Sequence, residues 1–174
     1  YYPGTVDKAE QLERQYPDSV FLIPALACKG DALINMYRYK EAIETLNRAI
    51  SHMHTGSEEM IRCSYLLGKA FYYEKNYGQA LEKLHLACTL ALTDGVMEYY
   101  HPSVLFSGKI YYLLKDYEQS VPLMEYAVAN GNKYSKTDYN EVLQSLMLSY
   151  NQTSKANTTC DFYVHFDKKS FEKD

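Results

Sequence analysis

A glycine that recurs at nearly equal intervals within helical patterns constrains this 174-residue sequence more than any other feature. Gly30, Gly68 and Gly108 lie 38 residues apart (30 to 68) and then 40 residues apart (68 to 108). Each glycine is followed at fixed distances by a large apolar or aromatic residue, a tyrosine, a small residue, a second large apolar residue and an alanine. The matching residues are Leu33, Tyr39, Ala42, Leu46 and Ala49; Phe71, Tyr77, Ala80, Leu84 and Ala87; and Tyr111, Tyr117, Ser120, Met124 and Ala127. Self-similarity with this period is typical of repeat proteins in which each unit is a pair of helices.

The residue types in the repeat have a physical explanation. Glycine inside a helix costs ~1 kcal/mol relative to alanine, and this cost is acceptable where the missing side chain allows a second helix to approach closely. The small residues Ala42, Ala80 and Ser120 play the complementary part on the second helix. The three repeated tyrosines each follow a polar or charged residue. We expect them at the turn between two helices, where the ring covers the corner and the hydroxyl reaches water.

With this order of small, aromatic, tyrosine, alanine and large apolar residues, the sequence resembles the tetratricopeptide repeat family over about residues 24–130. The glycine spacing exceeds the ~34 residues usual in that family. The segment Tyr100-His101-Pro102-Ser103-Val104 looks like the His-Pro start of the long repeats in kinesin light chains and many bacterial regulators. The family's early tryptophan and closing proline are missing from these repeats. The resemblance implies an all-α fold, a right-handed α-α superhelix of antiparallel helix pairs.

The whole chain, 1–174, is expected to form a single tetratricopeptide-like domain. Its parts are 1–19 as the second helix of a preceding repeat, 20–54, 57–93 and 97–131 as three repeats, and 136–174 as a partial or capping repeat. In the end segments, Thr5–Tyr16 and Asp138–Tyr150 have helical spacing, and Thr159, Tyr163 and Phe166 would give a last helix its apolar face. The chain begins without methionine and with half a repeat, so we expect it to be part of a longer protein.

In the tetratricopeptide family the first helix of each pair lines a concave groove that holds a partner, and the resemblance implies such a groove here. With each repeated glycine as a reference, the residues one helical turn before it, just after it and one turn after it would face the groove, and a fourth unit is counted in the same frame. The predicted partner-binding residues are Asp31, Asn35, Tyr65, Lys69, Tyr72, Leu105, Lys109, Tyr112 and Gln144.

Lys69 and Lys109 form a candidate basic pair in this groove, flanked by Tyr72 and Tyr112. Ammonium groups beside tyrosines suit an extended peptide with a carboxylate or an acidic side chain. The alternative interpretation is that both lysines are solvated residues on a helix face. Asp31 would repel a carboxylate, so we do not expect the terminal-carboxylate clamp of chaperone-binding family members. Changing both lysines to glutamate is expected to abolish binding of an acidic peptide and to leave helicity unchanged.

Composition and motifs argue against several other classes of protein. The net charge of −4 gives no sign of the basic face that nucleic-acid binding needs, and no apolar run reaches the ~18 residues of a membrane span. No glycine-rich phosphate loop occurs, so no cofactor is expected. His52-Met53-His54 offers only two ligands and is better explained as a solvated helix end, so no metal site is expected. No titratable groups stand at a catalytic spacing, and we predict no enzyme activity.

The four cysteines, Cys28, Cys63, Cys88 and Cys160, are far apart and form no C-x-x-C pair. Cys63 and Cys88 fall within strong helical patterns, which predicts buried free thiols and favours a reducing compartment. We therefore expect a cytoplasmic protein, or a periplasmic one if the chain is part of a sensor.

These patterns predict a scaffold that presents a concave groove to a protein or peptide, as part of a larger protein. The alternative is the regulatory or sensor domain of a bacterial signalling protein, a kinase, phosphatase or transcription regulator, whose catalytic or DNA-binding part is absent. Self-association through the tyrosine- and methionine-rich outer faces is a third hypothesis.

Overall fold

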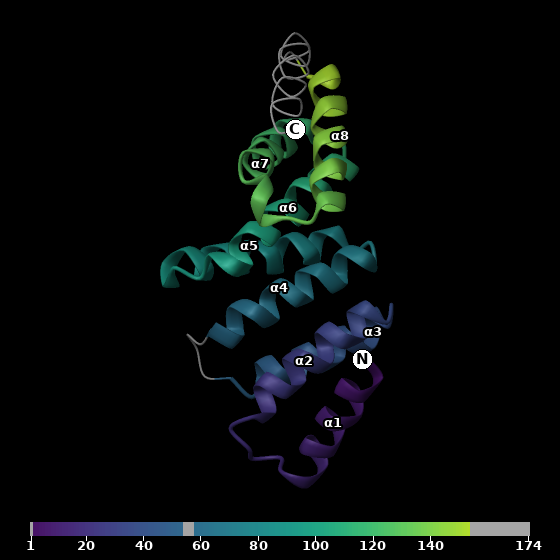
Figure 1. Ribbon diagram of the computed structural model, residues 1–174, viewed down its shortest axis with the longest axis vertical. Helices are drawn as coiled ribbons and strands as arrows, with labels where there is room; N and C mark the ends of the chain where they lie inside the picture. Colours follow the sequence, from purple (N-terminus) through teal and green to yellow (C-terminus); the bar gives the residue numbers. More distant parts are fainter. Residues whose placement is uncertain (1, 54–57, 154–174) are drawn as a thin grey trace, which may run out of the picture. The chain divides into compact units, whose positions relative to one another are not determined.

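The computed structural model of this chain describes residues 2–53 and 58–153. These residues form eight α-helices and one short 3-10 helix, with no strand among them, which confirms the predicted all-α class (Figure 1). The helices are α1 (Tyr2–Gln15), α2 (Leu22–Asn35), α3 (Tyr39–Ser51), α4 (Glu58–Tyr73), α5 (Tyr77–Asp94), α6 (Met97–Leu113), α7 (Tyr117–Ala129), the 3-10 helix η1 (Gly131–Lys133) and α8 (Lys136–Gln152). None of these helices is long and apolar enough to cross a membrane.

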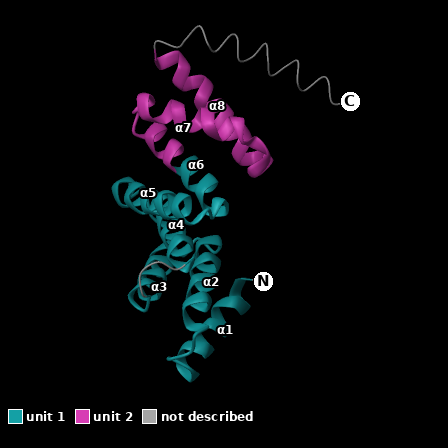
Figure 2. Ribbon diagram, turned by 90° about the vertical axis from the view of Figure 1, so that its left-hand side faces the viewer, with its two compact units in different colours: residues 1–106 teal, residues 107–174 magenta. Residues whose placement is uncertain are grey.

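The chain divides into two compact units, Tyr1–Phe106 (unit 1) and Ser107–Asp174 (unit 2), and the boundary falls inside α6 (Figure 2). In unit 1 each helix from α1 to α4 packs against the next one along the chain. The first helices of successive pairs, α2 and α4, also contact each other directly. In unit 2, α7 packs against α8. Unit 1 therefore brings two first helices side by side, which is what a shared binding surface requires.

The repeated glycines lie within first helices, as predicted, and they let a large side chain of the second helix reach the backbone. A methyl group at Gly30 would lie 2.5 Å from Leu46 Cδ2, and one at Gly68 would lie 2.6 Å from Leu84 Cγ. Both leucines are completely buried. The side chain that needs the space is therefore the repeated large apolar residue. Ala42 and Ala80, also completely buried, leave room beside it.

Unit 2 has a looser version of the same contact. A methyl group at Gly108 would lie 3.3 Å from Leu123 Cβ and 3.4 Å from Met124 Cγ. Ser120, at the repeated small position, donates a hydrogen bond of 3.0 Å from its Oγ to the Gly108 carbonyl. This bond gives the buried hydroxyl a partner and ties α7 to the first helix of its pair.

The turns inside the three helix pairs share one backbone conformation. In each, the residue two before the repeated tyrosine lies in the left-handed region, and the next N–H donates to the carbonyl five residues earlier, as in a Schellman helix end. The left-handed residues are Tyr37 (φ 60°), Lys75 (60°) and Lys115 (62°), and the 2.9 Å hydrogen bonds run from Arg38 to Leu33, from Asn76 to Phe71 and from Asp116 to Tyr111.

The repeated tyrosines follow these turns as the half-buried first residues of α3, α5 and α7. Two of the three second helices are capped by a side chain in the usual way: Asn76 accepts from the Gln79 N–H and Asp116 from the Gln119 N–H. Arg38 stands at the cap of α3 without capping it and instead pairs with Glu41 at 2.6 Å.

The two helices predicted near the chain ends are present as α1 and α8. α8 begins earlier than its Asp138 start signal suggested, because Ser135 caps it and accepts from the Asp138 N–H. The buried Tyr150 donates a 2.7 Å hydrogen bond to Glu125 on α7 and fixes the other end of α8. The further helix predicted around Thr159 to Phe166 lies outside the described residues.

The His-Pro segment does not mark the start of its helix, because α6 begins at Met97 and contains Pro102. Proline lacks an N–H and leaves one helical carbonyl without its usual donor. That carbonyl belongs to Glu98, four residues before Pro102. The next residue, Ser103, donates from its hydroxyl to the following carbonyl, that of Tyr99, at 2.7 Å. The extra turn brings Tyr99 onto the helix, which matters for the surface described below.

Two glycines of unit 1 should respond in opposite ways to the same substitution. Gly68→Ala places a methyl group against Leu84 and is expected to lower the free energy of unfolding by about 1–3 kcal/mol. Gly78→Ala, in the first turn of α5 with open space around it, is expected to raise it by about 0.5–1 kcal/mol. Urea denaturation followed by circular dichroism measures both changes. Equal effects of the two substitutions would contradict the close contact.

The left-handed turn residue gives a second stability prediction. Lys75→Gly relieves a conformation that is unfavourable for L-residues and should raise the free energy of unfolding by about 0.5–1 kcal/mol. His85→Gly, at an exposed position within α5, introduces the same residue and should lower it by about 1 kcal/mol. The same denaturation experiment compares the two, and a loss of stability in Lys75→Gly would rule out strain at the turn.

Candidate partner-binding surface

Aromatic rings gather in unit 1, on α4 and on the first part of α6. Phe106 is only 7% exposed, and its ring centroid lies 5.1 Å from that of Tyr72 and 6.3 Å from that of Tyr65. Tyr65 in turn lies 5.9 Å from Tyr99. The three tyrosines are half-buried, so each residue is partly packed and partly accessible. We call these four residues the aromatic platform.

The predicted residues on α2 lie beside α4 but interact first with each other. Asn35 donates from Nδ2 to the Asp31 carbonyl at 2.8 Å. Lys69, on α4, has its Nζ 4.0 Å from Asp31 Oδ1, and the exposed fractions of the two side chains are 19% and 44%. Lys69 thus faces a carboxylate of the neighbouring first helix in a long ion pair that is partly open to solvent.

A second cross-helix contact lies one turn earlier. Arg62 on α4 donates from Nη2 to the exposed Cys28 Sγ on α2 at 3.2 Å. Its Nη1 lies 3.8 Å from Glu59 Oε2, which is beyond hydrogen-bond reach. That buried oxygen accepts no hydrogen bond from any described residue.

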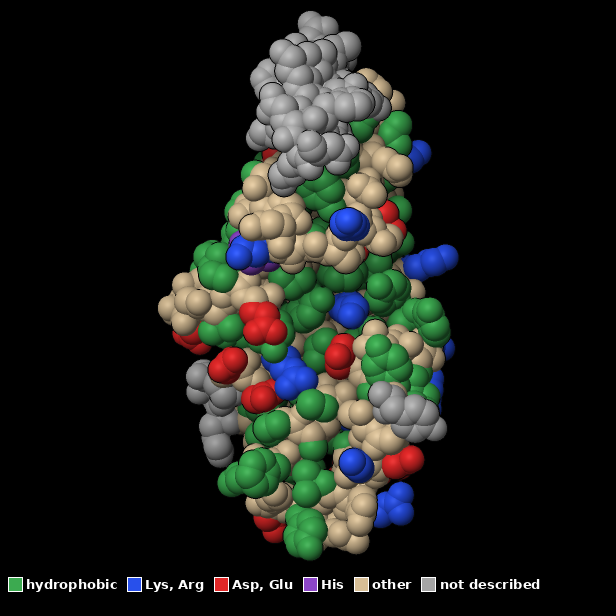
Figure 3. Space-filling view, in the orientation of Figure 1, with side chains coloured by type: hydrophobic (Ala, Val, Ile, Leu, Met, Phe, Trp, Pro, Cys, Tyr) green, Lys and Arg blue, Asp and Glu red, His purple; other side chains and the backbone are tan. Residues whose placement is uncertain are grey.

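We define the first-helix surface of unit 1 as the aromatic platform together with Cys28, Asp31, Asn35, Arg62 and Lys69. Charged side chains interspersed with hydrophobic ones over α2 and α4 are visible in Figure 3.

In unit 2, Lys109 is surrounded by carboxylates of α8. Its Nζ lies 2.8 Å from Glu141 Oε2 and 3.1 Å from Asp138 Oδ1, and its side chain is only 11% exposed. Burial lowers the pKa of Lys109, but the hydrogen bonds to Glu141 and Asp138 act more strongly in the other direction, so the pKa lies above its usual value. Lys109 therefore holds α6 to α8 as a protonated side chain.

The remaining predicted residues differ widely in accessibility. Leu105 is 3% exposed and belongs to the core of unit 1, where it cannot meet a partner. Tyr112 is half-buried in unit 2, with its ring edge against Tyr117 at 6.0 Å. Gln144 is exposed on α8. The structure thus brings together the predicted residues of α2 and α4 as one surface of unit 1.

Comparison with known proteins identifies the fold. No protein-family model matches the chain, and no curated protein matches it. Two crystal structures of MamA are similar, with TM-scores of 0.76 and 0.75 at 17% and 16% sequence identity, covering 99% of this chain and 90% and 86% of MamA. A crystal structure of kinesin light chain TPR-like repeats from Podosopora anserina has a TM-score of 0.71 at 14% identity and covers 99% of this chain and 89% of that one.

The chain has a tetratricopeptide-like repeat fold. The predicted solenoid of helix pairs is therefore confirmed, and so is the similarity to long repeats such as those of kinesin light chains. In this fold, α2, α4 and α6 are the first helices of successive pairs. They contribute all the residues of the first-helix surface.

Four members of the first-helix surface were not predicted: Cys28, Arg62, Tyr99 and Phe106. Arg62 stands three residues before Tyr65 and seven before Lys69, so extending the same helix face by one turn would have found it. Tyr99 was missed because the helix was expected to begin at the His-Pro segment. Phe106 directly follows the predicted Leu105. The rotation of α6 about its own axis decides which of the two side chains packs against the tyrosines of α4.

The other candidate chemistry of the chain does not converge on a site. Within residues 2–53 and 58–153 no three His, Cys, Asp or Glu side chains are placed to hold a metal ion. Burial is the main cause that raises the pKa of the Cys63 thiol to about 12 and that of Cys88 to about 11. Cys63 is completely buried and Cys88 partly buried, both as free thiols, whereas Cys28 is exposed. His54 and Cys160 lie outside the described residues.

A cavity of about 590 Å³ between α1, α2 and α3 is lined mostly by charged side chains, several of which form ion pairs. The buried Lys29 meets Glu10 at 2.9 Å, and this hydrogen bond is the first cause that lowers the pKa of Glu10. Arg48 meets Glu13 at 2.6 Å. These pairs join the three helices, and we assign the charges a structural part.

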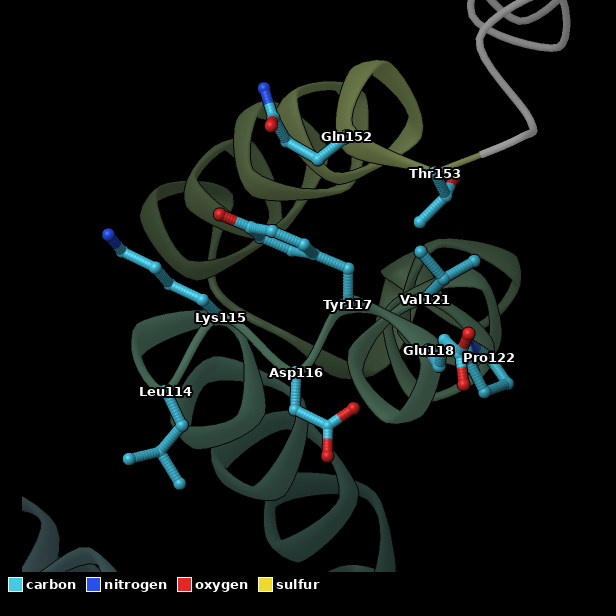
Figure 4. A pocket seen from close by; sticks show the side chains of 9 residues that line it. All are labelled: Leu114, Lys115, Asp116, Tyr117, Glu118, Val121, Pro122, Gln152 and Thr153. Carbon is cyan, nitrogen blue, oxygen red and sulfur yellow. The ribbon is translucent and has the colours of Figure 1, made fainter.

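A larger cavity, of about 920 Å³, lies in unit 2 between the α6–α7 turn and the end of α8 (Figure 4). The ring of Tyr117 extends across it toward α8, whereas Leu114 and Asp116 point away from that helix. The cavity reaches Thr153, the last residue that the structure describes. We place no binding site there.

The position of Lys109 changes the expected result of reversing its charge. Lys109→Glu would place three carboxylates together between α6 and α8, so it should lower the free energy of unfolding by about 1–3 kcal/mol. Lys133→Glu, an exposed lysine with no ion pair to a described residue, should stay within about 0.5 kcal/mol of the wild type. Urea denaturation separates the two variants, and equal stabilities would show that the Lys109 pairs contribute nothing. The double lysine reversal is thus unsuitable as a test of binding alone.

Proposed function

We propose that this chain is a non-catalytic scaffold that binds a protein or an extended peptide on the first-helix surface of unit 1. The observation that carries the proposal is the aromatic platform, in which the half-buried rings of Tyr65 and Tyr72 rest on the nearly buried Phe106. Tyrosines held by packing offer contact area at a small cost in conformational entropy, and they are enriched among the residues that dominate binding energy.

The fold supports the same proposal. Tetratricopeptide-like pairs place their first helices next to each other, and here α2 and α4 are in direct contact. A segment lying across them would touch side chains from both helices at once.

The predicted recognition of an acidic partner by Lys69 and Lys109 has little support from the charges around these lysines. Lys109 donates to Glu141 and Asp138, and Lys69 lies 4.0 Å from Asp31. An acidic group would have to displace these carboxylates. The tyrosines therefore carry the proposal, and the lysines do not.

Selection from a random dodecapeptide library displayed on phage tests the proposal. Peptides selected on the wild-type protein should lose at least tenfold in affinity for Tyr65→Leu/Tyr72→Leu, as expected when two central contacts are weakened (tenfold is about 1.4 kcal/mol). Leucine keeps the packing on Phe106 while it removes the hydroxyl and the ring face. Isothermal titration calorimetry with synthetic copies of the peptides gives the affinities.

The matched control is Tyr2→Leu/Tyr16→Leu, which changes two tyrosines that are 50% and 61% exposed at the ends of α1. It should leave the affinities unchanged, and circular dichroism should show the same helicity for all three proteins. A library that yields no binder, or peptides that bind the Tyr65/Tyr72 variant as tightly as the wild type, would refute a partner site on this surface.

A further inference from the structure

The cations of the first-helix surface are already engaged by the protein itself. Lys69 faces Asp31, and Arg62 divides its guanidinium between Cys28 and Glu59. Both side chains are largely covered, with exposed fractions of 19% and 25%. A ligand that needed a positive charge here would have to break contacts that join α2 to α4.

The carboxylates of the same surface exceed its nearby cations. Glu58 and Glu59 lie at the start of α4 and Glu98 at the start of α6, and among the described residues only Glu59 has a cation, Arg62, within 4 Å. Glu58 and Glu98 are exposed, and neither forms an ion pair with a described residue. Glu59 Oε2 lies 3.8 Å from Arg62 Nη1 and accepts no hydrogen bond from the described part of the chain. Arg62 therefore neutralises the charge of Glu59 only in part.

Tyr99 connects this negative region to the aromatic platform. Burial raises the pKa of the Tyr99 hydroxyl, Arg62 lowers it, and the charges of Glu98, Glu59 and Glu58 raise it again. All four charged groups act on the Tyr99 hydroxyl. Glu98 directly precedes Tyr99 in the first turn of α6, and the Tyr99 ring lies 5.9 Å from that of Tyr65. Accessible tyrosine faces and unbalanced carboxylates lie next to one another on one surface.

We infer that the partner segment carries arginine among apolar residues and places a guanidinium over the aromatic platform, next to Glu58 and Glu98. Arginine is the side chain that combines both kinds of contact, because its planar guanidinium stacks on aromatic faces and donates in pairs to carboxylates. The apolar neighbours would cover the exposed faces of Tyr65 and Tyr72. This inference rests on the proposed function and adds the chemical class of the partner.

The charge balance excludes the competing choices. An acidic peptide would meet the excess carboxylates without a cation to receive it, and like charges in contact are unfavourable. A nucleic acid or an anionic membrane surface would be repelled for the same reason. A wholly apolar segment would leave the negative region without a counterpart.

Three acetylated and amidated dodecapeptides of the form (Gly-X-Leu)₄, with X as arginine, serine or glutamate, are the probes. In isothermal titration calorimetry with the full chain, the arginine peptide should bind at least tenfold more tightly than the serine and glutamate peptides. A lysine version should bind more weakly than the arginine peptide, because an ammonium group does not stack as a guanidinium does. Raising sodium chloride from about 50 to about 500 mM should weaken the arginine peptide most, since exposed charges are screened.

Two double variants with the same charge change locate the effect. Glu58→Gln/Glu98→Gln should reduce the affinity for the arginine peptide at least fivefold and leave the serine peptide unchanged. The control, Glu44→Gln/Glu82→Gln, removes two exposed carboxylates from the second helices α3 and α5 and should change neither affinity. All four substitutions are at exposed positions, so circular dichroism should show wild-type folding.

The outcomes separate this inference from the proposed function. Serine or glutamate peptides that bind as tightly as the arginine peptide, with loss in Tyr65→Leu/Tyr72→Leu, would overturn the arginine preference and leave the surface as a binding site. An equal loss of arginine-peptide affinity in both glutamate variants would overturn the local charge argument. An arginine peptide that does not bind at 1 mM would also overturn the inference, and if the phage library yields no binder either, the proposed function fails with it.

Discussion

The distance between the two helices of each pair in unit 1 depends on a leucine that occupies the space left by a glycine. Leu46 and Leu84 are completely buried against the backbone at Gly30 and Gly68, closer than any side chain at those positions would permit. A core packed this closely has little freedom to slide, because a shift of either helix would lose contacts or cause a clash. The first helices are held in register as a consequence, and the contact of α2 with α4 follows from it.

That register decides which side chains can act together on the outside of the pair. Arg62, Tyr65, Lys69 and Tyr72 follow one another at intervals of three or four residues, so they share one face of α4. The residues they meet on α2, Cys28 and Asp31, are spaced in the same way. The aromatic platform adds α6 as a third helix through Tyr99 and Phe106. A single partner segment could therefore contact three helices without any movement of the backbone.

Local patterns were enough to predict the fold, because glycine spacing, capping residues and helical periodicity are properties of neighbouring residues. The spacing of Tyr65, Lys69 and Tyr72 places them on one face of α4, where the structure has them. They failed where a residue's environment comes from far along the chain. Lys109 could not be assigned to Asp138 and Glu141 from spacing alone, because the contact depends on where α8 packs. For the same reason, nothing local showed that Leu105 would be buried while Phe106 would support two tyrosines.

The cross-helix ion pairs and hydrogen bonds indicate which residues of the first helices stabilise the fold and which are accessible to a partner. Stacked first helices lie about 10 Å apart, a distance that a lysine or arginine can span to reach the next helix. Arg62, Lys69 and Lys109 all do so, each within its own unit, and each meets an acceptor on the adjacent first helix. Long cationic side chains on this face are therefore used to join neighbouring helices. The tyrosine rings of α4 also reach the next first helix, through Tyr99 and Phe106, but they stay half-buried and so keep accessible surface for a partner.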